Sequence, residues 1–373
     1  MKKIKLILSI RSLDIGGAER QFIELVKYID KMKFDVTVCT MYGGVQEEIV
    51  KAIPNITYYN LNKKGRYDFY TFYKNYKRVL NDIKPDIIYS FMGEMNLFSL
   101  WCKPKKTKII WGFRASNMDL KRYGKVPQIV FWLQKKLSKK VDKIISNSNA
   151  SIEFHKISGF YMEKSVVIYN GIDTDRFKRD EKKREAFRQK YNLNIDDIAI
   201  GMVARIDYMK GYTIFAMLAK RLLQKYDNIK FFSIGSGDEN IKKECVELLG
   251  SYNNTRFIWL GKQSSVEDFY SGFDIYTSTS LFGEGFSNSI AEAMSCKLPC
   301  VVSDVGDSKV IVSSCGVAVE PNSVDAFVEE VANLIQKDIK ELGACSRDRI
   351  VKNFSIEKMV KNTESEILKC VEL

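Results

Sequence analysis

The sequence is poor in the residues that build metal sites, disulfide frameworks and membrane spans. Histidine occurs once in 373 residues, at His155, and the eight cysteines are scattered without a CxxC spacing. No metal-ligand cluster is therefore visible. No apolar run approaches the roughly 18 residues that a membrane-spanning helix requires. Proline is also rare, at six residues, which is atypical of a disordered or fibrous chain. These absences predict a cytoplasmic globular protein with reduced cysteines, long enough for two domains.

The chain alternates β-branched runs with stretches of helical period, a pattern typical of α/β folds with parallel sheets. The first residues, MKKIKLILSI, are basic and then apolar as in a signal peptide, but the apolar part is short, so we predict a strand. The first half contains seven such runs, at 3–10, 35–40, 55–60, 86–91, 108–113, 142–148 and 165–170.

The pattern restarts after a charge-dense segment from Asp173 to Asp197. Five further runs lie at 198–204, 230–236, 256–261, 274–279 and 298–304. The restart predicts two doubly wound domains, 1–172 and 173–354, facing each other across a cleft. A final helix is predicted at about 355–373; its apolar stripe could dock anywhere, including back on the first domain. Ligand sites in such domains lie at the carboxyl ends of the strands.

Positive charge is concentrated in the first half of the chain. The net charge is +13, with +17 in residues 1–200 and −4 in the remainder. Residues 101–140 contain a single acidic residue, Asp119, and twelve basic residues: Lys103, Lys105, Lys106, Lys108, Arg114, Lys121, Arg122, Lys125, Lys135, Lys136, Lys139 and Lys140. This asymmetry indicates a membrane surface, a phosphate-bearing substrate or nucleic acid as partner. The stretch KVPQIVFWLQKKLSKKVD reads as a basic amphipathic helix, partly packed in the core and partly suited to a membrane surface.

Glycines and cations follow several predicted strands. LDIGGAER places Gly16 and Gly17 at the start of the first helix, where the backbone can approach an anion closely. VARIDYMKGY places Arg205 and Lys210 after a strand and before another helix, as a diphosphate clamp would require, although two ordinary surface charges are the simpler alternative. SIGSGDE adds Gly235 after the next strand.

The stretch GEGFSNSIAEAMSCKLPC is the most informative. We predict a loop that leads into a helix beginning near Ser287, so that loop amides and the helix N-terminus face a bound anion. Glu292 falls one turn into this helix and suits a vicinal diol such as ribose. Glu284, in the loop, suits a second set of hydroxyls. A dipole-stabilising acid and a solvated loop acid are the simpler alternatives.

Two other features have competing interpretations. Asp173 and Asp175 form a D-x-D that could bind a metal, but their place after a strand favours a turn and helix cap. His155 is the sole candidate for a histidine base, and a structural or substrate-orienting role is equally compatible with its position on a helix.

Together these motifs resemble retaining glycosyltransferases of family 4, which have the GT-B architecture of two Rossmann-like domains. The resemblance covers nearly the whole chain and rests on IGGAER, ISNSNASIEFH, VIYNGIDTDRF, VARIDYMKG, SIGSGDE, WLGK and GEGFSNSIAEAMSCKLPCVVSDVGDS. It implies transfer of a sugar from a nucleotide diphosphate, preferably a UDP-hexose or UDP-N-acetylhexosamine, to a lipid-linked saccharide in surface polysaccharide assembly. The enzyme would be peripheral on the inner face of the cell membrane, with an anionic membrane surface as partner, no nucleic acid, and no cofactor or metal.

The resemblance also assigns residues. The first domain would face acceptor and membrane, and the second would bind the nucleotide sugar. Arg205, Lys210 and Glu284 are the expected catalytic residues, with the two cations on the donor diphosphate and Glu284 on the donor sugar. The other expected donor contacts are Gly16, Gly17, Gly235, Leu260, Gly261, Gly285, Phe286, Ser287, Asn288 and Glu292, with Leu260–Gly261 at the base and Glu292 at the ribose.

One departure from the family concerns the first domain. A histidine commonly follows its fourth strand, whereas this sequence reads YSFMGEMN and then IIWGFRASNMDL. The candidate acceptor-binding residues are Glu94, Asn96, Arg114, Asn117 and His155. Two alternatives stay open: a nucleotide-sugar epimerase on the same architecture, and a nucleic-acid-binding protein that uses the basic first half, although no reader motif is recognisable.

Overall fold

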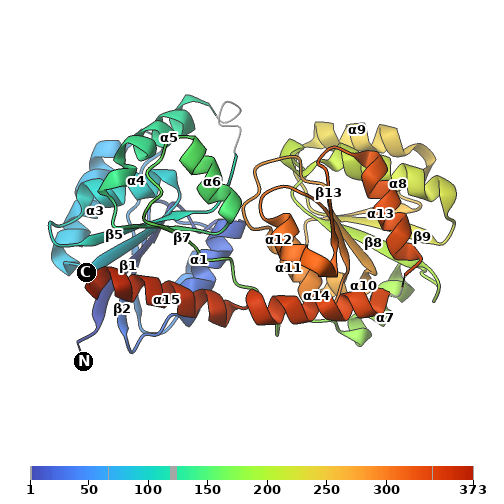
Figure 1. Ribbon diagram of the computed structural model, residues 1–373. Coiled ribbons are helices and arrows are strands. Elements are labelled where there is room, and N and C mark those ends of the chain that lie inside the picture. The colour runs from blue at the N-terminus through green and yellow to red at the C-terminus, as the bar shows by residue number, and fades with distance from the viewer. Residues whose placement is uncertain (1, 66, 118–123, 338, 373) are drawn as a thin grey trace. The chain divides into compact units, whose positions relative to one another are not determined.

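Figure 1 shows the computed structural model, which describes residues 2–65, 67–117, 124–337 and 339–372. The chain divides into two compact units. The second unit is Ile172–Ser355, and the first unit comprises the chain up to Gly171 together with the stretch from Ile356 onward. The predicted boundaries, after residues 172 and 354, each lie one residue from these divisions.

The described residues of the first unit form one parallel sheet of seven strands, in the order β3-β2-β1-β4-β5-β6-β7. Strands that are covered on both faces need continuous apolar runs, as in β4, where all five residues are buried. The strands are β1 Ile4–Ile10, β2 Phe34–Thr40, β3 Ile56–Asn60, β4 Ile87–Phe91, β5 Lys108–Phe113, β6 Lys143–Ser146 and β7 Ser165–Val167. All seven overlap the predicted runs.

Helices cover both faces of this sheet. Successive strand residues point to opposite faces, so Leu6 and Leu8 pack with α1 and α15 while Ile7 packs with α3 and α4. The helical elements of the first unit are α1 Gly17–Tyr28, α2 Glu47–Lys51, α3 Phe69–Ile83, α4 Gly93–Cys102, α5 Lys125–Leu137, the 3-10 helix η2 Ser138–Lys140, α6 Asn149–Ile157 and α15 Ile356–Glu372.

The last helix, α15, returns to the first unit, and Figure 1 shows it in dark red beside α1. Its apolar stripe contributes Met359, Val360 and Ile367 to the core that α1 also lines. Glu364 Oε1 accepts a hydrogen bond from the backbone N–H of Asp30 at 2.8 Å. The C-terminal segment is therefore part of the first unit's core.

The described residues of the second unit form a parallel sheet of six strands, in the order β10-β9-β8-β11-β12-β13. The strands are β8 Ile198–Val203, β9 Ile229–Ile234, β10 Phe257–Gly261, β11 Ile275–Ser278, β12 Cys300–Ser303 and β13 Val317–Val319. Sequence reasoning missed β13 because three residues are too few to show a pattern.

The helical elements of the second unit connect these strands and flank its sheet. They are α7 Glu181–Lys190, η3 Tyr208–Lys210, α8 Tyr212–Lys225, α9 Glu239–Leu249, η4 Gly250–Tyr252, α10 Val266–Gly272, α11 Asn288–Ser295, α12 Ser308–Val312, η5 Ser313–Cys315, α13 Val324–Ile335 and α14 Ile339–Asn353. The predicted α/β class with two doubly wound parallel sheets is confirmed.

The two sheets share a topological rule that positions ligand sites. In each unit the first three strands extend the sheet in one direction, and the fourth strand then pairs with the first on its other side. The switch point therefore lies between β1 and β4 in the first unit and between β8 and β11 in the second. Open α/β sheets bind ligands at the carboxyl ends of the strands that flank such a point.

Candidate functional site

The turn after β8 carries the two predicted cations of the second unit. Arg205 Nη2 lies 3.1 Å from Asp207 Oδ2, and the Arg205 side chain is 64% exposed. Asp207 Oδ1 accepts a hydrogen bond from the backbone N–H of Met209 at 3.0 Å, which caps the short 3-10 helix that contains Lys210. Arg205 is thus held near the strand end while its guanidinium stays accessible.

Gly211 fixes this turn against the end of β11. Its φ is +62°, and a Cβ at this position would lie 2.0 Å from the carbonyl oxygen of Thr279. Thr279 Oγ1 donates to the carbonyl oxygens of Lys210 (3.1 Å) and Gly211 (3.0 Å). Only glycine fits such a left-handed and crowded position. The turn that carries Lys210 therefore packs closely against the end of β11.

Lys210 and Glu284 form an ion pair across the switch point of the second unit. Lys210 Nζ contacts Glu284 Oε1, and Ser280 Oγ donates to the same oxygen at 2.7 Å. The two side chains are 19% and 10% exposed. Burial raises the pKa of Glu284, but the charge and hydrogen bond of Lys210, together with Ser280, outweigh burial and lower the pKa below its usual value. Glu284 is therefore an ionised carboxylate at neutral pH.

The loop that carries Glu284 is held by the loop after β12. Gly306 has a φ of +63°, and a Cβ on it would lie 2.5 Å from the carbonyl oxygen of Glu284. The backbone N–H of Asp307 donates to the carbonyl of Gly285 at 3.0 Å. Phe286 is buried, and its ring centroid lies 5.2 Å from that of Phe354. The predicted donor-contacting loop is thus rigidly supported.

The helix α11 begins at Asn288 with Ser287 as its N-cap residue, as predicted. The N-terminus of a helix carries partial positive charge, so this helix start favours an anion. Glu292, one turn further on, is 2% exposed, and its Oε2 accepts a hydrogen bond from Tyr270 Oη at 3.2 Å. Its contact with ribose stays a prediction.

The ends of β9 and β10 bring three other predicted donor residues together. The N–H of Gly235 donates to the carbonyl of Gly261 at 2.9 Å. Gly235 has a φ of +143°, and a Cβ there would lie 1.8 Å from the carbonyl oxygen of Ala204. The carbonyl of Leu260 accepts a hydrogen bond from Gln263 Nε2 at 2.5 Å. These residues lie at the same carboxyl edge of the sheet as the cation-bearing turn.

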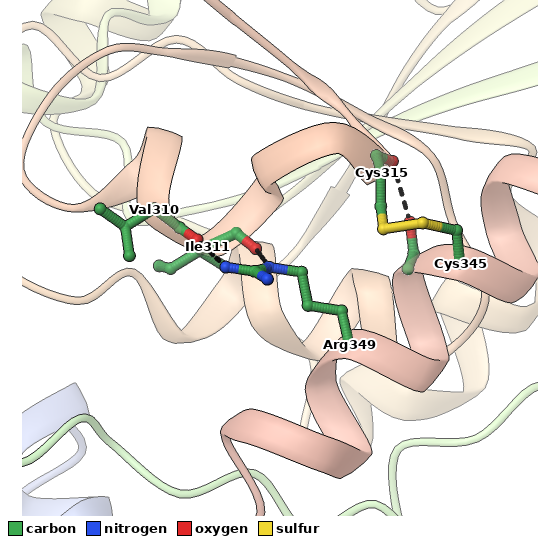
Figure 2. Close-up of a disulfide and its surroundings, with 6 residues drawn as sticks. Val310, Ile311, Cys315, Cys345 and Arg349 are labelled. Carbon is green, nitrogen blue, oxygen red and sulfur yellow. Dashed lines mark hydrogen bonds between the residues drawn. A yellow bond between two sulfur atoms is a disulfide. The ribbon is translucent and has the colours of Figure 1, made fainter.

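A disulfide ties the segment after α12 to α14. It joins Cys315 to Cys345, with 5.4 Å between their Cα atoms. The expectation of reduced cysteines is therefore wrong for this pair, whereas the other six cysteines, all within the described ranges, are free and buried. Figure 2 shows Arg349 of α14 beside this bond, donating to the carbonyl oxygens of Val310 and Ile311. Both connections hold α12, which follows the loop that supports Glu284.

In the first unit, α1 begins at Gly17 and Gly16 precedes it in extended conformation. A Cβ on Gly16 would lie 2.0 Å from Oε2 of Glu19. Burial raises the pKa of Glu19, and a hydrogen bond with its own backbone N–H offsets only part of this effect. The helix start thus already has a carboxyl group of the chain beside it, which sequence reasoning missed.

Three predicted acceptor residues follow β4 and β5. Glu94 lies in the first turn of α4 and pairs with Arg11, which was not predicted. Asn117 is exposed. Arg114 is partly buried, with Nη2 donating to Tyr89 Oη at 2.7 Å. Its guanidinium carbon also lies 4.5 Å from the ring centroid of Phe91.

Two predicted acceptor residues do not fit that role. Asn96 is fully buried, and its Oδ1 accepts a hydrogen bond from Ser90 Oγ at 2.8 Å, so its side chain belongs to the packing of the sheet. His155 is stacked on Phe113, with 4.2 Å between ring centroids, and its Nδ1 lies 2.7 Å from the carbonyl oxygen of Ser151. Burial lowers the pKa of His155 to about 4. The structure thus supports the structural interpretation of this histidine.

The predicted amphipathic stretch forms α5. Ile129 and Trp132 are each 55% exposed on it, and Lys136, Lys139 and Lys140 are exposed along and just after it. Three charged residues of the basic region, Asp119, Lys121 and Arg122, lie outside the described residues. Within the described ranges, no helix combines the length and apolar character needed to cross a bilayer.

The D-x-D segment forms a turn, as predicted. Asp173 Oδ1 accepts hydrogen bonds from the backbone N–H groups of Asp175 (3.2 Å) and Arg176 (2.9 Å). In the part of the chain that the structure describes, no three His, Cys, Asp or Glu residues come together as candidate metal ligands. The expectation that the reaction needs no metal stays a prediction.

Two family models match adjacent parts of the chain. The model described as Glycosyltransferase Family 4 matches residues 15–176, and the model described as Glycosyl transferases group 1 matches residues 183–353. Together they cover both structural units and most of the sequence.

Relatives over most of the chain are named as transferases that act on lipid-linked saccharides. The chain is 24% identical to the UDP-Gal:alpha-D-GlcNAc-diphosphoundecaprenol alpha-1,3-galactosyltransferase of Escherichia coli, with 95% of this chain and 88% of the relative covered. It is 23% identical to a Campylobacter jejuni protein, with 80% of each covered. That relative is named N-acetylgalactosamine-N,N'-diacetylbacillosaminyl-diphospho-undecaprenol 4-alpha-N-acetylgalactosaminyltransferase.

Solved structures share the fold. HepE from Anabaena, in complex with UDP-glucose, superposes with a TM-score of 0.84 at 18% identity, covering 98% of this chain and 100% of the other. WaaG, a glycosyltransferase of lipopolysaccharide biosynthesis, gives a TM-score of 0.74 at 13% identity, covering 96% and 98%. The epimerase alternative is not supported, because the relatives are named as glycosyltransferases. The chain is therefore a family 4-like glycosyltransferase with the GT-B fold.

Proposed function

We propose that this enzyme transfers a sugar from a UDP-sugar, with retained anomeric configuration, to a lipid-linked saccharide in the assembly of a surface polysaccharide. The observation that carries the proposal is the Lys210–Glu284 pair at the switch point of the second unit. Arg205 belongs to the same turn as Lys210, and the loop of Glu284 leads into α11. The names of the E. coli and C. jejuni relatives support the acceptor class, and the UDP-glucose complex of HepE supports the donor class.

The proposed chemistry depends on stabilising the leaving diphosphate. As the bond to the sugar breaks, negative charge grows on the phosphate oxygens, and Arg205, Lys210 and the first-turn N–H groups of α11 are suited to stabilise it. Glu284 would contact the donor sugar and Glu292 the ribose. The leaving phosphate would take the acceptor proton on the same face of the sugar, so that neither an enzymic nucleophile nor a metal is needed.

A panel of UDP- and GDP-sugars tests the donor class. A ligand that binds the folded state raises its thermal stability, and a UDP-sugar should raise the melting temperature more than the matching GDP-sugar. The active donor is then incubated with a polyprenyl-diphosphate-linked saccharide, and the anomeric configuration of the product is read by NMR. Donor turnover without any acceptor product, or an inverted linkage, would contradict the proposal.

We further propose that α5 brings the enzyme to the inner face of the cell membrane. Ile129 and Trp132 supply exposed apolar surface, and Lys136, Lys139 and Lys140 supply charge for an anionic bilayer. Trp132→Ala should reduce co-sedimentation with anionic vesicles, while Ile195→Ala, which removes a 92% exposed apolar side chain from the second unit, should not. Equal binding to neutral and anionic vesicles would contradict the electrostatic part.

A further inference from the structure

Both units place an ion pair across the switch point of their sheet. In the second unit Lys210 follows the first strand and Glu284 follows the fourth. In the first unit Arg11 directly follows β1, the first strand, and Glu94 lies three residues after β4, the fourth. The Arg11 Nε and Glu94 Oε2 atoms are 3.1 Å apart. The pair of the first unit therefore occupies the place where an open α/β sheet binds its ligand.

The backbone that presents Glu94 is strained. Met92, between the end of β4 and the start of α4, has a φ of +73° and a ψ of 150°, a backbone conformation that residues other than glycine rarely adopt. Such strain persists where the surrounding structure enforces it, and it concentrates at functional sites. The Arg11–Glu94 ion pair adds little to the free energy of unfolding, because its side chains are 52% and 24% exposed. Folding stability therefore does not explain the strained backbone at Met92.

The neighbourhood of the pair is built from aromatic and basic side chains at the same edge of the sheet. The guanidinium carbon of Arg11 lies 5.8 Å from the centroid of the Tyr42 ring. Lys63, which is 6% exposed, donates from Nζ to Tyr42 Oη at 3.0 Å and to the carbonyl of Gly65 at 2.5 Å. The Tyr42 ring is therefore held at both its edge and its face.

We propose that Arg11, Glu94 and Tyr42 bind the terminal sugar of the acceptor, and that this sugar is uncharged. The inference rests on the proposed function. A guanidinium donates to sugar hydroxyls and a carboxylate accepts from them, so the pair offers both halves of a hydroxyl-binding site. The Tyr42 ring adds an apolar surface. The charges of Arg11 and Glu94 cancel, so the pair itself supplies no excess positive charge for a carboxylate or phosphate.

Direct binding tests this inference without requiring turnover. Calorimetry measures the affinity of the free enzyme for alkyl glycosides of glucose, galactose, N-acetylglucosamine and N-acetylgalactosamine, and for a glucuronide. The same titrations are repeated with Glu94→Gln and with Glu366→Gln. The second variant is a matched control, because Glu366 pairs with Lys143 at the amino end of β6, the opposite edge of the same sheet.

We expect an uncharged glycoside to bind the wild type. Glu94→Gln should weaken this binding by about tenfold to a hundredfold, the range for losing hydrogen bonds to a charged group, whereas Glu366→Gln leaves the affinity unchanged. Binding of UDP should be equal in all three proteins. Where transfer is measurable, Glu94→Gln should raise KM for the acceptor and leave KM for the donor unchanged.

Three outcomes would overturn the inference: no uncharged glycoside binds the wild type, Glu94→Gln and Glu366→Gln bind alike, or the glucuronide binds more tightly than every uncharged glycoside. Failure of the proposed function is distinct, because it would show as normal glycoside binding without sugar transfer.

Discussion

Replacing Lys210 by methionine separates the structural and catalytic roles of the buried ion pair. The substitution keeps most of the apolar stem but removes the ammonium group, so Glu284, 10% exposed, loses its counter-charge and keeps the hydrogen bond from Ser280. Removing one partner of a buried ion pair costs about 3–5 kcal/mol, because the remaining charge is uncompensated. We expect the lower end, about 3 kcal/mol, because Ser280 still contacts the carboxylate.

Two companion variants calibrate this value. Glu284→Gln leaves Lys210, which is 19% exposed, without its counter-charge, but creates no buried carboxylate, and should cost about 1–2 kcal/mol. The double variant Lys210→Met/Glu284→Gln buries no unpaired charge and should be within about 1 kcal/mol of the wild type. All three should lose activity, and Lys210→Met should lose about 2–4 kcal/mol of transition-state stabilisation.

The pH dependence provides a second test. In the wild type the folded-state pKa of Glu284 is lowered, so its stabilising contribution is present above the unfolded pKa and is lost as pH falls through the folded value. In Lys210→Met, burial is the dominant influence on Glu284 and raises its pKa in the folded state. The unpaired carboxylate destabilises the folded variant, and this destabilisation shrinks as pH falls through the raised pKa and the carboxylate becomes protonated. The stability difference between wild type and Lys210→Met should therefore narrow between pH 7 and pH 4.

Urea unfolding, followed by circular dichroism across this pH range, measures these differences, and kcat/KM is measured on the same preparations. If Lys210→Met and Glu284→Gln are equally stable at pH 7 and respond alike to acid, the pair is not buried as described. If the double variant regains both stability and activity, Lys210 has no part in catalysis.

Four further predictions follow from individual contacts. Arg205→Ala should leave the melting temperature unchanged, because the Arg205 side chain is 64% exposed, while kcat/KM falls on the order of a hundredfold. Full activity of this variant would show that Arg205 does not bind the donor diphosphate. Cys315→Ser/Cys345→Ser opens a loop of 30 residues and should cost about 3–4 kcal/mol by chain entropy, measured by urea unfolding under oxidising conditions; equal stability would show the bond does not form. His155, the only imidazole, should titrate near pH 4 by NMR, so stability contributed by its burial declines as pH falls below about 6.5; a midpoint above 6 would contradict its burial. Gly211→Ala should destabilise the enzyme by at least 1–2 kcal/mol, roughly the penalty of a left-handed residue, in thermal unfolding, and an unchanged melting temperature would contradict the tight turn.

Local patterns were sufficient to place every strand except β13 along the described parts of the chain. Seven runs predicted the strands of the first sheet, because strands covered on both faces are rich in apolar and β-branched residues. The start of α11 after Ser287 was also predictable, since cap residues and helical period are written in neighbouring positions. The strand β13 was missed because Val317–Val319 is defined by pairing with β12 and not by its own pattern.

Burial and pairing required the tertiary structure. The sequence left open whether His155 is a structural residue or acts on the substrate. In the structure its ring packs against those of Phe113 and Phe160, from other parts of the chain, which supports the structural role. Likewise Cys315 and Cys345 have no recognisable spacing, and their bond depends on how α14 packs beside η5.

The sequence by itself determined two doubly wound units and singled out Arg205, Lys210 and Glu284 as separate charged residues after strands. It could not show that Lys210 contacts Glu284, 74 positions away, or that Arg11 contacts Glu94. Both contacts follow from strand order, because the fourth strand of each unit returns to lie beside the first. Only the tertiary structure decides that order, since it depends on long-range packing that no local window of sequence contains.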